Sequence, residues 1–460
     1  MREILRIENN IPHNESLLIS KIDIKEDGAI VPRVEYKVYN SKGKQLDMSV
    51  CNGVPISVSY PLFNTDLIPL FEDASELSKR GFDVYNPKDS FYNDICSSYS
   101  NGTVDVVLKD RRKDIYVDVH FCQEGCVYEG INYTTNKVNC NCDGNNADII
   151  NFDDFGNSMF QQTNLILLKC YKQIIKKETY KMNIGVYFCG SIFVINYILV
   201  IIFCISGYNK VYFKYKAILD KFYYENSQFK QISTTEQSID IDNVSFKQAV
   251  SMEDRNFFKF FFLLLFNQIE IIKVFFFSGD FDLLPISLSL FLFSIASDYT
   301  MNALLFSDDV ISERYHNQGE LNPLTTYALS FLSNLLGCLI SYIAVKLTSF
   351  TTLLELLAIE HIKEKDYIQK LKEIMYTIKV KITLFFIYEI SMMIVYLYFL
   401  SIFCSVYKAS QWNWFTNGIM SNLLSFLYTV ILSVTISVCR FIGIYCHSES
   451  IYNISLYLNH

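Results

Sequence analysis

The feature that most constrains this chain is a series of apolar runs, beginning near residue 183, that are each long enough to cross a lipid bilayer. A helix needs about 20 apolar residues to span the hydrocarbon core. Five segments meet this requirement, namely residues 184–206, 283–306, 324–347, 382–406 and 421–445. The sequence therefore predicts an α-helical multi-pass membrane domain over residues 183–447, with the lipid bilayer as its first partner and a C-terminal tail over residues 448–460.

A further apolar run, residues 257–277, contains nine phenylalanines but is interrupted by polar and charged residues, which are Asn267, Gln268, Glu270 and Lys273. We interpret this run as an interfacial helix at the membrane surface, or as a re-entrant segment, rather than as a sixth span. A sixth span would also move the lysine-rich connector at residues 348–381 to the outer side, which the positive-inside rule opposes.

The distribution of lysine favours one orientation of the five spans. If the N-terminal part lies outside, the lysine-rich connectors at residues 207–282 and 348–381 lie in the cytoplasm, as the positive-inside rule requires. The outer connectors then carry little positive charge beyond Arg314 and Lys408. An opposing group before the first span consists of Lys169, Lys172, Lys176, Lys177 and Lys181. On balance we expect the protein to lie in the plasma membrane, with the N-terminal domain outside and the C-terminus in the cytoplasm.

The N-terminal part has the pattern of a small β-rich domain. Residues 17–39 alternate polar and apolar side chains, with Asp-Gly and Pro-Arg breaks, and residues 54–60 continue the alternation. This pattern is typical of half-buried strands joined by turns. We therefore predict a β-rich, disulfide-stapled ectodomain over residues 1–150 and a juxtamembrane segment over residues 151–182.

Six cysteines of this domain are disulfide candidates, namely Cys51, Cys96, Cys122, Cys126, Cys140 and Cys142. The last four are spaced like a compact segment held by two bridges, and Cys51 with Cys96 is a candidate for a third. The sequence alone does not fix the connectivity. Zinc held by four thiolates in a reducing compartment is the alternative, although we expect no metal and no cofactor.

Glycosylation sequons favour the disulfide interpretation. Asn14, Asn101 and Asn132 each begin an Asn-x-Ser/Thr sequence, and the last two flank the cysteine cluster. Glycosylation and disulfide formation both belong to the secretory lumen, so we expect a cell-surface glycoprotein. The N-terminus lacks the apolar core of a signal peptide, and we therefore expect the natural chain to extend upstream of Met1.

Three stretches resemble a known family. Residues 91–142 (FYNDICSSYSNGTVDVVLKDRRKDIYVDVHFCQEGCVYEGINYTTNKVNCNC), residues 298–319 and residues 396–415 are similar to a module of large surface proteins of ciliated protozoa. In those proteins, cysteine-rich or growth-factor-like repeats end in a multi-pass tail. The resemblance covers about Leu17 to Ile444, but here the last span lacks the expected proline and the upstream repeats are missing. It implies the architecture and no activity, because the family has none described.

Ionisable side chains inside spans are costly and therefore candidates for function. Asp298, Glu389 and Arg440 fall in the predicted spans. Glu389 and Arg440 share a predicted depth, so we expect them to form a buried ion pair that sets helix register. The alternative is a channel or transporter whose ion or proton pathway uses these polar groups.

Motifs for catalysis are missing from the sequence. The six histidines are scattered, and no G-x-S-x-G, Gly-rich phosphate loop or HExxH is present. The net charge of -8 comes without a basic stripe, which argues against nucleic-acid binding. We therefore predict a non-enzymatic surface membrane protein for adhesion, sensing or surface structure, with an extracellular protein or glycan as a further partner. A channel or transporter is the alternative.

Overall fold

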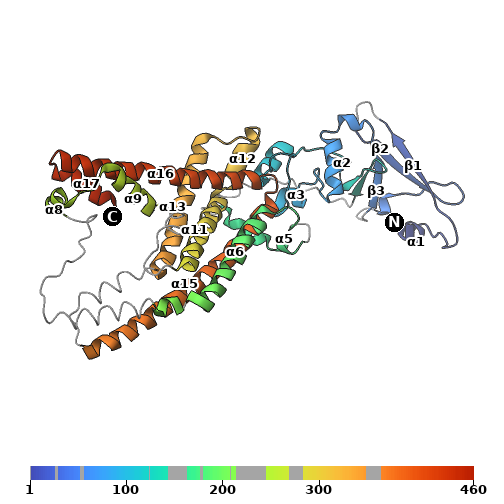
Figure 1. The fold of residues 1–460 in the computed structure, drawn as a ribbon. Coiled ribbons are helices and arrows are strands. Elements are labelled where there is room, and N and C mark those ends of the chain that lie inside the picture. The colour runs from blue at the N-terminus through green and yellow to red at the C-terminus, as the bar shows by residue number, and fades with distance from the viewer. Residues whose placement is uncertain are drawn as a thin grey trace. The chain divides into compact units, whose positions relative to one another are not determined.

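The structure is a computed structural model that describes residues 2–25, 30–51, 56–123, 125–142, 163–176, 180–207, 209–213, 245–268, 283–348 and 364–459. The chain forms two compact units. We call Met1–Tyr99 together with Val106–Asn157 the N-terminal unit, and Ser100–Asp105 together with Ser158–His460 the membrane unit. Figure 1 shows the elements of both units.

Among its described residues, the N-terminal unit has two antiparallel sheets (Figure 1). β1 (Leu18–Ile24) pairs with β2 (Arg33–Tyr39), and β5 (Lys137–Cys142) lies between β3 (Ile56–Pro61) and β4 (Cys126–Asn132). β1, β2 and β3 confirm the strands predicted from alternation. The sequence analysis missed β4, β5 and the helices, which are α1 (Arg2–Glu8), α2 (Phe71–Lys79), α3 (Ser90–Asn93) and α4 (Leu108–Asp110), with short turns at Ser49–Cys51, Thr65–Leu67 and Arg111–Ile115.

An aromatic core holds this unit together. Phe91 and Tyr92 are fully buried, and their rings meet edge to face with centroids 4.9 Å apart. The Arg111 guanidinium lies 5.3 Å from the Phe91 ring and donates to the backbone carbonyl of Val106 at 2.8 Å. Carbonyl dipoles and a ring face thus help to stabilise the buried cation in an otherwise apolar core.

Among the described residues of the membrane unit, five helices are long and apolar enough to cross a membrane. They are α6 (Ile184–Ile202) within a span that runs to Phe213, α11 (Leu284–Leu305), α13 (Pro323–Thr348), α15 (Glu364–Val406) and α16 (Gln411–Tyr445). These helices confirm the five predicted spans. The shorter elements are Asn164–Cys170, α5 (Lys172–Ile175), Phe203–Gly207, α8 (Phe246–Met252), α9 (Phe257–Gln268), α12 (Asp308–His316) and α17 (Glu449–Asn459).

α6 and α15 lie side by side and run in opposite directions (Figure 1). At one end of the pair, a Cβ on Gly185 would lie only 2.5 Å from the carbonyl oxygen of Leu400, so this close approach requires glycine. At the other end, the rings of Phe203 and Phe386 are 5.3 Å apart. Small residues at such positions let membrane helices pack by van der Waals contact, which is their main attraction in lipid.

The phenylalanine-rich run begins as the helix α9, which packs beside the C-terminal part of α16 (Figure 1). Phe260 and Leu264 form an apolar cluster with Ile436, and the ring of Phe257 lies 5.8 Å from that of Phe441. Phe258 on the other side of the helix is exposed. α9 coincides with the first part of the predicted interfacial helix, whose residues 269–277 lie outside the described residues.

Candidate functional site

Buried polar side chains occur at successive depths along four helices of the membrane unit, and we call this series the polar track. Its members are Ser289, Ser297, Asp298, Asn302, Ser330, Ser333, Glu389, Tyr396, Asn417 and Ser421. A helix rises 1.5 Å per residue, so Ser289 and Asn302 of α11 are about 20 Å apart along its axis. This is a large part of a hydrocarbon core of about 30 Å.

Glu389 lies at one end of the track. Its side chain is 1% exposed, and its two carboxylate oxygens are 2.6 and 2.7 Å from the hydroxyl of Ser289. A serine hydroxyl has one proton, so it can donate to one of these oxygens at a time. Next to Glu389, Tyr388 donates to the backbone carbonyl of Ile340 at 3.2 Å. The carboxyl group thus links α15 to α11, while its neighbour links α15 to α13.

Asp298 and Asn302 continue the track toward the other end of α11, and both are buried. Asp298 packs against Gly337 of α13, where a Cβ would overlap its Oδ1. Asn302 donates to the hydroxyl of Ser333 at 3.4 Å, and its Oδ1 accepts no hydrogen bond from the described residues. Between these levels and Glu389, the hydroxyl groups of Ser297 and Tyr396 are 3.0 Å apart.

Ser330, Asn417 and Ser421 join α13 to α16. The hydroxyl of Ser330 donates to Oδ1 of Asn417 at 3.0 Å, and Ser421 donates to the Ser330 carbonyl at 3.0 Å. Such interhelical hydrogen bonds hold membrane helices together. The same hydroxyl, amide and carboxyl groups are also those that relay protons or coordinate small cations, so the polar track permits either role.

Asn196 of α6 was not singled out in the sequence analysis. It is 3% exposed, and neither of its amide atoms has a hydrogen-bond partner among the described residues. Its depth follows from the α6–α15 contacts, because Gly190 faces Leu397 and Phe203 faces Phe386. Asn196 lies between these contacts and therefore at about the level of Glu389. The signal was present as a single amide within the apolar run IFVINYILV.

The predicted ion pair between Glu389 and Arg440 is wrong. Arg440 instead donates from Nε and Nη2 to Glu253, at 2.9 and 2.8 Å, and Arg255 donates to the same carboxylate at 2.6 and 2.9 Å. The guanidinium of Arg440 also lies 4.9 Å from the centroid of the Phe260 ring. Glu389 and Arg440 share a predicted depth but do not form an ion pair, because the Arg440 side chain faces the segment between α8 and α9.

This arrangement disfavours protonation of Glu253. Burial by itself raises the pKa of the carboxyl group, but the hydrogen bonds and charges of Arg255 and Arg440 outweigh it and hold the pKa below its ordinary value. Glu253 and Arg440 have side chains that are each only 2% exposed. The result is a charged, buried clamp between the α8–α9 connection and α16.

A second buried charge cluster lies at the start of α16. The carboxylate of Asp105 accepts hydrogen bonds from the backbone N–H groups of Ala409 and Ser410, at 3.2 and 2.7 Å. Arg314, buried nearby, donates to the carbonyl of Gly319 at 3.0 Å. Its burial lowers its pKa, which the charge of Asp105 partly opposes. Asp105 thereby satisfies backbone donors at the positive end of a 35-residue helix.

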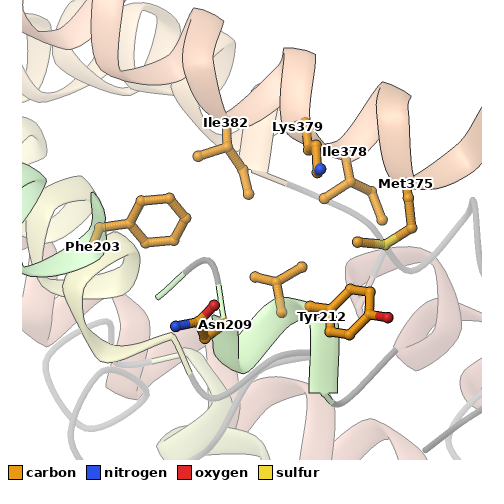
Figure 2. A pocket seen from close by; sticks show the side chains of 8 residues that line it. Phe203, Asn209, Tyr212, Met375, Ile378, Lys379 and Ile382 are labelled. Carbon is orange, nitrogen blue, oxygen red and sulfur yellow. The ribbon is translucent and has the colours of Figure 1, made fainter. Parts of the chain in front are cut away.

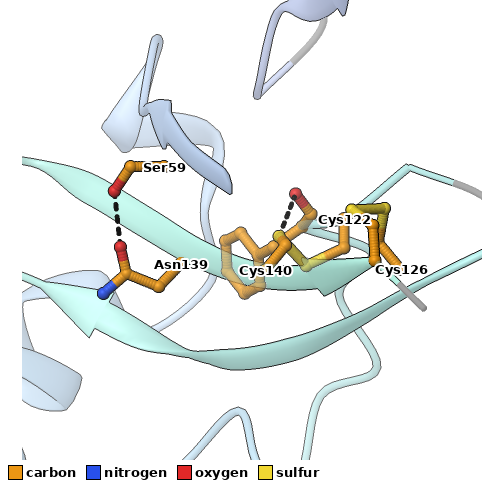
Figure 3. The surroundings of a disulfide bond; sticks show 7 residues. Ser59, Cys122, Cys126, Asn139 and Cys140 are labelled. Atoms are coloured by element: carbon orange, nitrogen blue, oxygen red, sulfur yellow. Dashed lines mark hydrogen bonds between the residues drawn. A yellow bond between two sulfur atoms is a disulfide. The ribbon is translucent and has the colours of Figure 1, made fainter. Parts of the chain in front are cut away.

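The cysteine cluster of the N-terminal unit forms two disulfides, Cys122–Cys140 and Cys126–Cys142 (Figure 3). They confirm the predicted stapled segment, and they contradict the zinc alternative because the four sulfurs are bonded in two pairs. Cys96 is also disulfide-bonded. The expected bridge between Cys51 and Cys96 is wrong, since Cys51 has a free thiol, buried in the apolar cluster formed with Leu5 and Val38.

The predicted glycosylation residues Asn14, Asn101 and Asn132 are all exposed. Oδ1 of Asn132 accepts from the backbone N–H groups of Thr134 and Thr135, and Oδ1 of Asn101 accepts from that of Val104. In each of these two turns the amide oxygen is fixed by the backbone. The side-chain nitrogen, which a glycan would modify, remains on the surface.

Comparisons with family models, curated proteins and solved structures each returned no match. The class of the protein therefore follows from its own architecture. It is a multi-pass membrane protein with five apolar spans among its described residues and a small, disulfide-stapled β-sheet unit in its N-terminal part.

Proposed function

We propose that this is a non-enzymatic cell-surface membrane protein whose N-terminal unit docks another protein through the β1–β2 hairpin. The orientation follows the lysine-rich connectors and the sequons, which favour an exposed N-terminal unit. The resemblance to the multi-pass tails of large protozoan surface proteins favours the same location. The observation that carries the docking proposal is the exposed apolar surface of β1.

β1 presents apolar side chains where a soluble domain normally has polar ones. Leu18 is 57% exposed, Ile19 56%, and Ile22 and Ile24 37% each. Among the described strands β1 pairs only with β2, so the other edge of β1 offers unpaired backbone N–H and C=O groups. A long, apolar edge strand is a template for another strand. Proteins use such edges to bind extended segments by β-augmentation.

The two faces of the hairpin differ, which gives the proposed interface a direction. On β2, Val34 and Val38 are buried against the rest of the unit. Their cross-strand partners are Asp23 and Ile19, so this inward face is buried on β2, whereas Asp23 and Ile19 of β1 remain exposed. Leu18, Ile22 and Ile24 alternate with these residues and lie on the outward face. The partner surface is therefore expected to be apolar and to add to β1 rather than to β2.

Cross-linking on intact cells tests this proposal with the full chain. A photoreactive benzophenone side chain placed at Ile22 should give a discrete higher-mass adduct, and an additional Ile24→Lys substitution should remove it. The same side chain at Ser41, exposed beyond the end of β2, is the matched control. Equal adducts from both positions, or none from Ile22, would refute docking at the hairpin.

The surface location is tested separately with the sequons. Glycosidase treatment should increase the mobility of the intact protein, and replacing both Asn101 and Asn132 with Gln should reduce that shift to what Asn14 contributes. An epitope near Gly125 should be accessible on unpermeabilised cells. Accessibility only after permeabilisation would reverse the orientation and exclude an extracellular partner.

A channel or transporter is the second candidate, and the polar track is the observation that favours it. Buried carboxyl, hydroxyl and amide groups occur at levels from Glu389 to Asn417, and Asn196 adds an amide at the level of Glu389. In proteoliposomes, a proton or cation flux that is lost in Glu389→Gln would support this function. The exposed Glu373→Gln provides the control. If flux is absent, or equal in both variants, the channel or transporter function is refuted and the polar track serves helix packing.

A further inference from the structure

A cavity of about 180 Å³ lies between the C-terminal part of the first span and the N-terminal part of α15 (Figure 2). Its wall is mainly apolar, with one ammonium, one amide and one phenol group. The lining residues are Phe203, Asn209, Val211, Tyr212, Met375, Ile378, Lys379 and Ile382. This cavity belongs to neither the polar track nor the proposed docking hairpin.

The cavity lies where two spans meet the membrane boundary. The first span runs over Ile184–Phe213 and the span within α15 over Met375–Val406. All lining residues therefore come from the last part of one span and the first part of the other. Because these two helices are antiparallel, the two parts lie at the same end of the bundle. A ligand in this cavity would reach the apolar core and the polar headgroup region together.

The polar groups of the lining have the chemistry of a headgroup site. Figure 2 shows Lys379 on the side of α15 that faces the cavity, with Asn209 and Tyr212 on the opposite wall. The charged residues next to the lining are predominantly basic, since Lys372, Lys381 and Lys210 outnumber Glu373. Clusters of this kind at a membrane surface attract anionic lipid headgroups. Ile378 and Ile382 of α15, by contrast, are buried and offer only apolar contact.

We propose that this cavity binds an anionic glycerophospholipid, with one acyl chain against Ile378 and Ile382 and the headgroup phosphate at Lys379 and Asn209. The volume fits a segment of one chain and not a whole drug-sized ligand, for which pockets of about 300–1,000 Å³ are usual. Surrounding lipid is as apolar as the cavity wall, so the chain gains little by moving into it. Selectivity for one lipid over another must therefore come from the headgroup, through its interaction with the charge of Lys379.

Native mass spectrometry of the full chain tests the proposal, using vesicle-derived phosphatidylserine and phosphatidylcholine of the same acyl composition. One lysine near an anionic surface changes binding about five-fold. We expect bound phosphatidylserine to exceed phosphatidylcholine by at least this factor, and Lys379→Gln to remove most of the excess. Lys379→Arg, which keeps the charge, should retain it, and so should Lys247→Gln, a matched change on the exposed face of α8.

The outcomes that overturn the proposal are distinct. Equal binding of the two lipids, or the same loss in Lys247→Gln as in Lys379→Gln, would mean unspecific attraction to the basic surface. Displacement of phosphatidylserine by inorganic phosphate would make this a phosphate site without a chain component. As a second measurement, a tryptophan introduced by Met375→Trp should be quenched more by phosphatidylserine with brominated acyl chains than by the brominated phosphatidylcholine. Equal quenching would refute selective binding even if the charge variants fail to fold.

Discussion

The clamp formed by Glu253, Arg255 and Arg440 makes a quantitative prediction about how α8, α9 and α17 are held to α16. Glu253→Gln keeps the side-chain shape but removes the negative charge that Arg255 and Arg440 share. Truncating one partner of a buried ion pair typically costs about 3–5 kcal/mol. We expect the lower end, about 3 kcal/mol, because the amide of glutamine still accepts a hydrogen bond and Arg255 is 12% exposed.

Hydrogen exchange of the full chain in nanodiscs measures this cost locally. A loss of about 3 kcal/mol in local opening free energy corresponds to roughly 100-fold faster exchange of protected amides. We expect the acceleration in α8 and α17, because α17 packs on α16 through Gly443, where a Cβ would lie 2.7 Å from the backbone nitrogen of Tyr452. The neighbouring exposed Asp254→Asn is the control, with an expected change below about 0.5 kcal/mol.

The same clamp has a defined pH dependence. The pKa of Glu253 is depressed in the folded protein, so its contribution is complete above the pKa of an unfolded glutamate, about 4.3. It is lost as the pH falls through the lower, folded value. Exchange in α8 and α17 should therefore accelerate below about pH 4 in the natural sequence and much less so in Glu253→Gln. Equal acid sensitivity of both proteins, or unchanged exchange in the variant at neutral pH, would refute the clamp.

Three further outcomes test other parts of the structure. Asp105→Ala removes two hydrogen bonds at the start of α16 and should lower stability by about 1–2 kcal/mol in thermal unfolding. Gly337→Ala should cost about 1–3 kcal/mol, because the new methyl group overlaps a buried carboxylate of α11. Gly190→Ala, which meets no other atom nearer than 3.9 Å, should be close to neutral. Replacing Cys126 and Cys142 with serine should cost about 3 kcal/mol and accelerate exchange in β4 and β5.

The spans were predictable because hydropathy over about 20 residues is a sum that single substitutions hardly change. β1 and β2 were predictable for a related reason, since alternation over seven residues leaves little ambiguity. α2 was missed although its sequence, FEDASELSK, places the buried Ala74 and Leu77 three residues apart. β4 and β5 gave a weaker signal, because their cysteines and asparagines resemble a loop and their pairing with the distant β3 has no local pattern in the sequence.

The polar contacts were much less predictable than the helices that carry them. Glu253 lies in a short connection 187 residues before its partner Arg440, and no local pattern links the two. Ser289 is one of several serines in an apolar run, and only the packing of α11 against α15 places its hydroxyl at Glu389. Free cysteines and bonded ones are likewise indistinguishable by spacing, since Cys51 was a disulfide candidate in the sequence and is a free thiol in the structure.

The failed pairing of Glu389 with Arg440 nevertheless informs the choice between the two proposed functions. Had the two side chains met, both charges would be neutralised within one contact, and Glu389 would serve only to fix helix register. Instead Arg440 is engaged by Glu253, and the only hydrogen-bond partner of Glu389 among the described residues is the Ser289 hydroxyl of α11, at about the depth of the amide of Asn196. A buried carboxyl group without a nearby cation is costly in a packing role alone. The flux experiment on Glu389 therefore distinguishes a channel or transporter from a surface protein without transport activity. If no flux depends on Glu389, helix packing must compensate for the free-energy cost of burying its carboxyl group.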